Sequence, residues 1–493
     1  MNSFAVTIIC ILLGLALAVR GLFRPFLGLL VFLAIHFVQP GELVPALAPL
    51  RIELVYGVLL VGTLVFKRGA EARSRLLSDR ILRGAVLVIA VGVLSVPFAI
   101  WQSGAAETVL DMLKLVTLMV MMDLLITSEY RLRSMLWSMA AIGAWFAGSS
   151  LFAYYHGDYY HLNYNLGDLD RAEGMNSMVG DPNSLAGLLL ALLPLLIALL
   201  RTTRNIFVRM LLIACGAVSL LAISLTGSRI AMIGLLAIGI YYALQSKRKV
   251  LTFTAALIIA CLLWNWMPQT YRQRYLTIQS YAGGGELDAS NQVRLEIWKA
   301  GQQIFLLHPI IGVGAGQFAN AYGMIYLAGR SGDWMQPHNL LIQVTCELGI
   351  IGLGVFVYFL WQIAKEIGVV LRQKGKPRLE LIYQVGIACS VMYVGVLILS
   401  TVGHTLYRPY WYLLGGLVAA NKAIAEEKLK ASKSVRLDRE RPKKSSKKKW
   451  HHRHDPTEQT RPLSYAGRTS PEGFVEGAGK TSSQIKFLQG RQT

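Results

Sequence analysis

Charged residues are scarce in this 493-residue chain: Asp, Glu, Lys and Arg make up 16% of it, against 54% for hydrophobic residues. This composition supplies too little polar surface to cover the roughly three soluble domains that the length would allow. Negatively charged residues are fewer than positively charged ones, with 28 Asp and Glu against 49 Lys and Arg. The sequence therefore predicts a polytopic membrane protein rather than a set of soluble domains.

Cysteine is also rare, and its spacing excludes two kinds of site. No two cysteines have the short, regular spacing of a metal site or a disulfide framework. All five lie within apolar runs, which predicts a packing role for Cys10, Cys215, Cys261, Cys346 and Cys389. The basic residues are not interleaved with aromatic residues on a folded surface, so nucleic acid is not an expected partner.

Long apolar runs are what the chain has in abundance. A helix needs about 20 apolar residues to cross the hydrocarbon core of a bilayer. Thirteen runs approach that length, and we expect an all-α fold with about 12 to 13 transmembrane helices. The runs are 3–19, 25–39, 53–66, 84–101, 109–127, 134–153, 184–200, 210–225, 230–245, 251–267, 340–363, 381–401 and 408–421.

The loops between these runs alternate in charge. One set holds 21 Lys and Arg and the other holds 9. Because basic loops resist translocation, the first set is expected to be cytoplasmic and the second periplasmic. This orientation divides the chain into a membrane domain, 1–421, and a cytoplasmic tail, 422–493. The tail is too basic and too poor in aliphatic residues to fold alone, so we expect disorder and attraction to anionic lipids.

Residues 268–337 form a periplasmic loop far longer than a connector, which indicates a function. Within it, Val293, Ile297, Ala300, Ile304 and Leu307 recur at helical spacing, so residues 289–308 predict an amphipathic helix on the outer surface. The glycines of 312–316 predict a flexible turn after it. The GVGAG sequence is not expected to bind a dinucleotide, because no strand precedes it.

Polar residues gather on the outer side, where neither ATP nor a nucleotide sugar is present. A synthetic enzyme there needs an activated substrate, such as a lipid-linked diphosphate, whose departing charge must be stabilised. The acids of the loop 154–183 show no ordered metal-ligand pattern; they are Asp158, Asp168, Asp170, Glu173 and Asp181. Arginines remain, since their forked donors suit phosphate oxygens.

Three outer arginines are candidates for holding a diphosphate. Arg229 follows a short turn at a predicted helix start, where unpaired backbone N–H groups favour an anion. Arg294 stands one turn before Trp298, so both can share one helix face. Arg171 is the weakest of the three. An interfacial arginine at 229 and a solvated helix charge at 294 remain alternative interpretations.

A base is also needed to deprotonate an acceptor hydroxyl, and His338 is the candidate. It follows Pro337 where the long loop returns to an apolar run. A capping or packing histidine is the alternative, and His156, His161, His308 and His404 are outer histidines with fewer polar neighbours. Ionisable residues within apolar runs are functional candidates by default; they are Glu347, Asp111, Lys114 and Asp123. Asp111 and Lys114 are expected to pair in a structural role.

Three sequence blocks resemble the O-antigen ligase and polymerase superfamily of bacterial envelope glycosyltransferases. The blocks are TGSRIAMIGL at 226–235, RLEIWKAGQQIFLLHPIIGVGAGQF at 294–318 and PHNLLIQVTCELGIIGLG at 337–354. A fourth, GDPNSLAGLLLALLPLL at 180–196, resembles the Asn-containing helix start of that family. The resemblance covers roughly residues 170–420.

The resemblance implies an all-helical, metal-independent, inverting glycosyltransferase that needs no cofactor. By position, Arg229 and Arg294 would hold the lipid diphosphate and His338 would be the base. Supporting positions are Trp298, Asn339, Glu347, Asn183 and Arg171. The basic tail and the acidic, Tyr-rich segment 154–170 depart from a typical member, which leaves the acceptor open.

The predicted enzyme lies in a bacterial inner membrane with a periplasmic active site. It transfers a glycan from undecaprenyl diphosphate to an acceptor, with the lipid A-core as the favoured acceptor. A polymerase of repeat units and a protein O-oligosaccharyltransferase are close alternatives. A transporter or flippase is the alternative from another functional class. Such a protein would be expected to show two similar halves with broken helices, whereas the polar features of this chain gather in one outer loop.

Overall fold

The computed structural model describes residues 3–157, 171–273, 276, 289–328 and 330–440. The chain divides into two compact units, Met1–Leu437 and Asp438–Thr493. All but the first three residues of the second unit fall outside the described part, and so does most of the predicted tail. The predicted boundary at residue 421 lies inside a helix that continues to Glu440.

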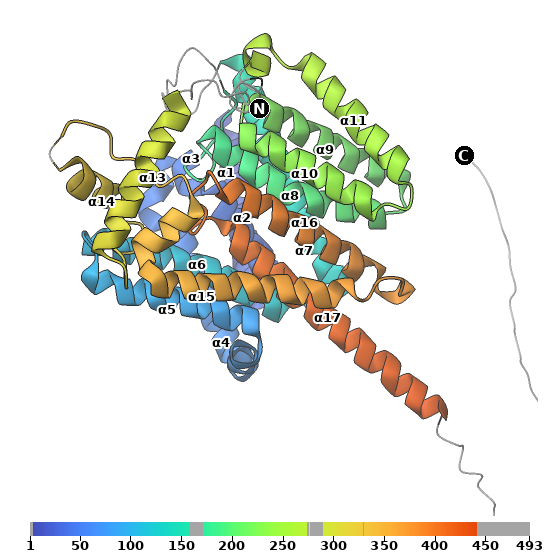
Figure 1. Cartoon of the computed structure of the whole chain (residues 1–493). Coiled ribbons are helices and arrows are strands. Elements are labelled where there is room, and N and C mark those ends of the chain that lie inside the picture. Colours follow the sequence, from blue (N-terminus) through green and yellow to red (C-terminus); the bar gives the residue numbers. More distant parts are fainter. Residues whose placement is uncertain (1–2, 158–170, 274–275, 277–288, 329, 441–493) are drawn as a thin grey trace, which may run out of the picture. The chain divides into compact units, whose positions relative to one another are not determined.

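Each of the thirteen predicted apolar runs coincides with a helix (Figure 1). All regular elements among the described residues are helical, so the all-α prediction is confirmed. These thirteen helices are α1 (Ser3–Phe23), α2 (Pro25–Val38), α4 (Ile52–Ser78), α5 (Arg80–Ser95), α6 (Gln102–Leu125), α7 (Glu129–His156), α8 (Pro182–Thr202), α9 (Ile206–Leu225), α10 (Arg229–Gln245), α11 (Lys249–Trp266), α15 (Leu340–Leu371), α16 (Glu380–Ser400) and α17 (Pro409–Glu440).

Eight helical segments in the described part are long and apolar enough to cross a membrane. Three further apolar helical segments are shorter: Leu12–Phe23 within α1, and helices α2 and α10. Helices α6 and α17 fall in neither group, because α6 carries four charged residues and the C-terminal half of α17 is polar. The chain is a multi-pass membrane protein, but fewer helices meet both criteria than the 12 to 13 spans predicted.

Local sequence explains where many helices begin. Five helices start at a side chain that accepts a hydrogen bond from an otherwise unpaired backbone N–H, as N-caps do. These caps are Asp79 for α5, Ser128 for α7, Asp181 for α8, Asn205 for α9 and Asn339 for α15. Two of them, Asp181 and Asn339, belong to the segments that later form the candidate site.

The helices differ in how deeply they are packed. In α8, 72% of the apolar window is buried, whereas none of the window in α11 is buried. Helix α8 packs against α7, α9 and α16, and α11 lies at the edge beside α10 (Figure 1). Helix α8 therefore belongs to the core of the bundle, and α11 exposes most of its apolar side chains.

The long segment between α11 and α15 contains a folded insertion. It consists of α13 (Ala289–Leu307), α14 (Phe318–Ala321) and η3 (Tyr322–Leu327), a turn of π-helix. Ile297, Ala300 and Ile304 of α13 are fully buried in a small core with Phe318 and Cys346. The predicted helix is confirmed, but Val293 and Leu307 are exposed, and the buried face packs on protein rather than only lying on a surface.

Helix α15 is broken at Gly349, where φ is 65° and ψ is −166°. The loop 309–316 supplies partners for backbone groups near the break: Val313 N–H donates to Cys346 O at 2.8 Å, and Ile350 N–H donates to Pro309 O at 2.9 Å. A Cβ at Gly312 would lie 2.4 Å from the Glu347 carbonyl carbon. The turn predicted at 312–316 is present, since Gln317 N–H donates to Gly314 O at 3.1 Å, but the loop is packed against the broken helix rather than free.

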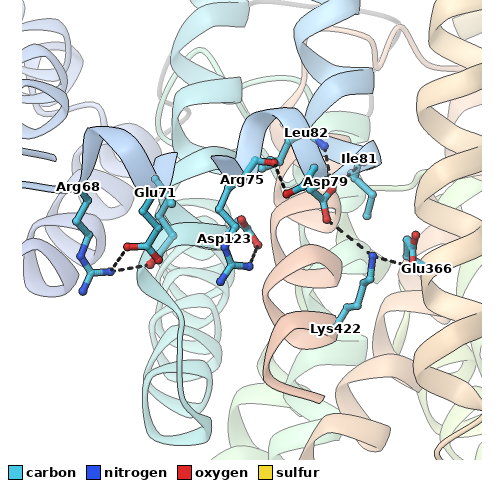
Figure 2. Close-up of polar contacts among 11 residues, drawn as sticks. Arg68, Glu71, Arg75, Asp79, Ile81, Leu82, Asp123, Glu366 and Lys422 are labelled. Atoms are coloured by element: carbon cyan, nitrogen blue, oxygen red, sulfur yellow. Dashed lines mark hydrogen bonds and ion pairs between the residues drawn. The ribbon is translucent and has the colours of Figure 1, made fainter. Parts of the chain in front are cut away.

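At one end of the bundle, here called the far end, charged side chains join four helices and the start of α5 (Figure 2). Lys422 Nζ of α17 lies 3.2 Å from Glu366 Oε2 of α15 and 4.0 Å from Asp79 Oδ2. Arg75 Nη1 of α4 lies 3.7 Å from Asp123 Oδ1 of α6. We call these five residues the far-end ion network. Asp123, a default functional candidate, thus faces an arginine of a neighbouring helix.

Candidate active site

Four helices begin together at the other end of the bundle, here called the site end. Tyr410 of α17 donates to the carbonyl of Ser184 in α8 at 3.2 Å. Asn339, the cap of α15, donates to the carbonyl of Thr401 after α16 at 2.9 Å. Arg171 donates through Nε to the carbonyl of Thr226, just before α10, at 2.6 Å. The loops that precede α8, α10, α15 and α17 therefore form one surface.

His338 occupies a strained position on this surface. Its φ is 44°, in the left-handed region that residues other than glycine seldom adopt. Such strain persists only where surrounding contacts impose it, and it clusters at functional sites. The next residue, Asn339, imposes part of it: its Oδ1 accepts from Ile342 N–H at 3.1 Å while its Nδ2 holds Thr401.

The surroundings of His338 favour the neutral imidazole. Burial lowers the pKa of His338 below its ordinary value, and the positive charge of Arg294 on α13 lowers it further, while Asp181 opposes the shift. A neutral imidazole can accept a proton, as a general base must. The structure therefore brings Arg294 and His338, both predicted site residues, within electrostatic range of each other.

A second histidine lies against the first. The rings of His338 and His404 are 5.5 Å apart between centroids and meet edge to face at 74°. Burial, Arg408 and His338 lower the pKa of His404 to about 3. His404 was one of several alternatives in the sequence, and its contact with His338 was not predicted.

Arg171, Asn183 and the turn before Arg229 form a second group of predicted residues. Besides its bond to Thr226, Arg171 donates through Nη2 to Asn183 Oδ1 at 3.4 Å. Gly227 gives this turn its left-handed residue, with φ at 61°. Arg229 is the first residue of α10 and is half-buried. Two predicted arginines are thus brought to one helix start.

Ser228 stands at the N-cap position of α10 with an unusual side chain. It is 1% exposed, yet its hydroxyl makes no hydrogen bond within the described part of the chain and does not cap the helix. A buried hydroxyl without a partner is destabilising. Such a hydroxyl at the start of a helix is available to an anion that the first-turn N–H groups would also attract.

Helix α13 carries Arg294 and Trp298 one turn apart. Ile297 and Ala300 anchor the helix in the insertion core, and this leaves Arg294 and Trp298 half-buried beside it. The indole N–H of Trp298 is buried and makes no hydrogen bond among the described residues. The indole N–H of Trp298 can therefore donate to a ligand. It lies on the same helix as Arg294, next to the buried residues Ile297 and Ala300 that fix the position of this helix.

Glu347 holds loops rather than facing the two histidines. Its carboxylate accepts from Gly316 N–H at 3.0 Å, from Phe318 N–H at 3.4 Å and from the Tyr407 hydroxyl at 2.5 Å. It thereby joins α15 to the loop 309–318 and to the segment after α16. Glu347 was predicted as a supporting residue, and in the structure it supports the two loops by accepting these hydrogen bonds.

The acidic residues of the outer loop fall into two groups. Asp158, Asp168 and Asp170 lie outside the described residues, whereas Glu173, which is half-buried, and Asp181 lie within them. Asp181 caps α8, where its carboxylate accepts from Ser184 N–H at 2.8 Å and from Asn183 Nδ2 at 3.3 Å. No three His, Cys, Asp or Glu side chains in the described ranges lie together as a metal ion would require.

Sequence reasoning gave too little weight to the segment TVGHTLYRPYW at 401–411. Its polar residues stand between two apolar runs, which is the signal that could have drawn attention to it. In the structure, this segment contributes His404 and also Arg408, whose Nη1 donates to Met178 O at 2.7 Å. It forms the wall of the site beside His338.

The predicted site residues lie in a region of the chain that is similar to a known protein family. A family model described as O-antigen ligase matches residues 214–357, which include Arg229, Arg294 and His338. Over this region the chain is similar to the O-antigen ligase family.

Curated proteins named as polysaccharide ligases are similar to part of the chain. A protein of Rickettsia prowazekii named "Putative polysaccharide ligase" is 26% identical over 215 residues, covering 40% of this chain and 48% of the relative. Proteins of the same name from Rickettsia conorii and Rickettsia typhi are each 24% identical, covering 33% and 40% of this chain and 36% and 48% of the relatives. The chain thus spans at most about half the length of these relatives.

Proposed function

We propose that this chain is a glycosyltransferase of the O-antigen ligase superfamily. It would move a glycan from undecaprenyl diphosphate to a hydroxyl acceptor, with the lipid A-core favoured. The observation that carries the proposal is the placement of the strained His338 within electrostatic range of Arg294, at the same bundle end as Arg171 and the start of α10. A base and several phosphate-binding groups on one surface suit transfer from a diphosphate.

The proposed reaction is a single displacement. His338 takes the proton from the acceptor hydroxyl as the oxygen attacks the anomeric carbon of the first sugar of the glycan. The bond between that carbon and the diphosphate oxygen breaks, and the diphosphate leaves with the electron pair. The anomeric configuration is inverted. The neutral state of His338, which burial and Arg294 favour by lowering its pKa, is the state this step needs.

The donor side of the proposed site rests on arginine. Arg229 and Arg294 would hold the diphosphate oxygens, whose negative charge grows as the bond breaks. Arg171 supports the turn before Arg229 through Thr226 and Asn183. In this proposal, the arginines supply the positive charge that a divalent metal supplies in other enzymes.

The proposed location is the periplasmic face of a bacterial inner membrane. The far end of the bundle carries clustered basic residues near the start of α5, including Lys67, Arg73 and Arg83, as cytoplasmic loops do. The site end would then face the periplasm, where lipid-linked glycans are substrates. The basic tail after residue 421 would lie in the cytoplasm and contact anionic lipids.

Deletion of the gene, followed by gel analysis of the envelope glycans, tests this function. Loss of all long chains with an intact lipid A-core supports ligation. A single repeat unit on the core would point to a polymerase, and unchanged lipopolysaccharide with lost glycoprotein would point to protein glycosylation. Unchanged glycans of every kind would contradict the proposal.

A further inference from the structure

We infer that His404 is a positioning residue for His338, whose ring it holds in place and shields from water. This inference rests on the proposed function, because His338 is the proposed base. The segment 401–408, here called the histidine loop, carries His404 between α16 and α17.

The histidine loop is held by hydrogen bonds along its length. Its first carbonyl, that of Thr401, accepts from Asn339 at 2.9 Å. Thr405 Oγ1 accepts from the indole of Trp411 at 3.2 Å and pairs with the hydroxyl of Ser400 at 2.6 Å. Leu406 N–H donates to Gln343 Oε1 at 3.1 Å.

The last two residues of the histidine loop are held as well. Tyr407 donates to Glu347 and accepts from Gly316 N–H at 3.0 Å, and Arg408 donates to Met178 O at 2.7 Å. The elements contacted on both sides of His404 are those that frame the proposed site. A loop fixed at both ends and in its middle holds its one histidine in a defined place.

The contact between His404 and His338 is a contact of rings, and no hydrogen bond joins these two described side chains. The two rings meet edge to face with centroids 5.5 Å apart, a favourable geometry for an aromatic pair. The Nδ1 atom of His404 is buried and makes no hydrogen bond in the part of the chain that the structure describes. Because that nitrogen bonds nothing there, a phenylalanine ring should be able to replace it.

The contact also explains how His338 stays neutral. The charged or titratable groups facing His338 are Arg294 from α13, Asp181 before α8 and His404; those facing His404 are Arg408 and His338. Burial is the largest cause of the lowered pKa of His338. Removal of the His404 ring would admit water and let that pKa rise toward its ordinary value near 6.5.

The experiment compares His404→Ala with His404→Phe in the full chain, purified in detergent. The rate at which diethyl pyrocarbonate modifies His338, followed by mass spectrometry across pH, reports both its exposure and its neutral fraction. We expect His404→Ala to raise this rate severalfold and to move its pH midpoint upward. His404→Phe should match the wild type in both quantities. His156→Ala, at an exposed position at the end of α7, is the control.

A second measurement is transfer in membranes of the deletion strain, which supply the cell's own donor and acceptor. His404→Ala should reduce transfer by about tenfold or more, since a displaced base loses its geometry. The acidic limb of its pH profile should move to higher pH, whereas loop damage alone would lower transfer at every pH. His404→Phe should restore both rate and profile.

Two results would overturn the inference. One is a His404→Ala protein whose His338 modification and acidic limb are those of the wild type. The other is a folded His404→Phe protein without transfer, because the nitrogen rather than the ring would then be required. Failure of the proposed function looks different: His338→Gln would keep transfer, while the modification data would still report the ring contact.

Discussion

The two ends of the bundle differ in whether their buried polar residues face opposite charges. At the far end, charges face opposite charges: Lys422 lies between Asp79 and Glu366, and Arg75 faces Asp123 (Figure 2). Asp79 also accepts from Ile81 and Leu82 N–H, so it caps α5. These charged side chains form ion pairs that join neighbouring helices.

The Asp123 carboxylate at the far end has no hydrogen bond among the described residues, but one of its oxygens lies 3.7 Å from Arg75 Nη1. At the site end, several neutral buried polar atoms have no hydrogen bond within the described part of the chain either. They include the Ser228 hydroxyl, the Trp298 indole N–H and the His404 Nδ1 atom. His338 is strained in addition. Unused groups and strain both reduce stability, and natural proteins retain them where a ligand or a reaction uses them. The difference predicts that far-end substitutions change stability and site-end substitutions change transfer.

The largest expected effect is on transfer at the site-end arginines. Arg294→Lys should lose on the order of a hundredfold in rate, because an ammonium group cannot meet two phosphate oxygens with a planar fork. Transfer is measured in membranes of the deletion strain at matched protein level. Arg68→Lys at the far end, where Arg68 donates to the Leu124 carbonyl, is the matched control and should keep transfer. Equal rates for both variants would remove Arg294 from the donor site.

A smaller effect, of the opposite kind, is expected at the far end. Lys422→Met leaves Glu366 buried without its cation, which should lower the free energy of unfolding by about 2 kcal/mol. Transfer per folded molecule should be unchanged. The double variant Lys422→Met with Glu366→Met should regain part of the stability, because the buried carboxylate of Glu366 is removed together with its cation. Thermal unfolding in detergent measures the stability of each variant. If Lys422→Met lost transfer but not stability, the proposed difference between the two ends would be wrong.

The smallest expected effect is on substrate binding at the Ser228 hydroxyl, where stability and binding should change in different directions. Ser228→Ala removes a buried hydroxyl without a partner, so thermal stability should stay equal or rise slightly. Binding of undecaprenyl diphosphate should weaken by a few fold, because one donor to the phosphate is lost. Ser219→Ala, where the hydroxyl donates to Cys215 O within α9, is the control and should leave binding intact. A Ser228→Ala protein that binds normally would limit the donor site to the arginines.

Local pattern was sufficient to predict much of this fold. Each long apolar run became a helix, because apolar length and helical periodicity are properties of neighbouring residues. The same holds for the buried face of α13 at Ile297, Ala300 and Ile304. The expected pairing of Asp111 with Lys114, one turn apart in α6, is confirmed at 2.7 Å.

Contacts between distant segments were not predictable in this way. The break at Gly349 depends on the loop 309–316, which lies some forty residues earlier in the chain. The pairing of His338 with His404 depends on Asn339 reaching Thr401, a separation of 62 residues. No local signal specifies such neighbours, so the sequence indicated the arginines and the proposed base but not the second histidine.

The central claim is that His338 is the base that acts on the acceptor. The most direct test measures transfer and donor binding for His338→Gln and His338→Ala in one membrane preparation. We predict that both variants lose transfer and keep most of their binding of undecaprenyl diphosphate. In the wild type, transfer should hold at neutral pH and fall only below about pH 6.5, because burial and Arg294 lower the pKa of His338. A His338→Gln protein with substantial transfer would contradict the account.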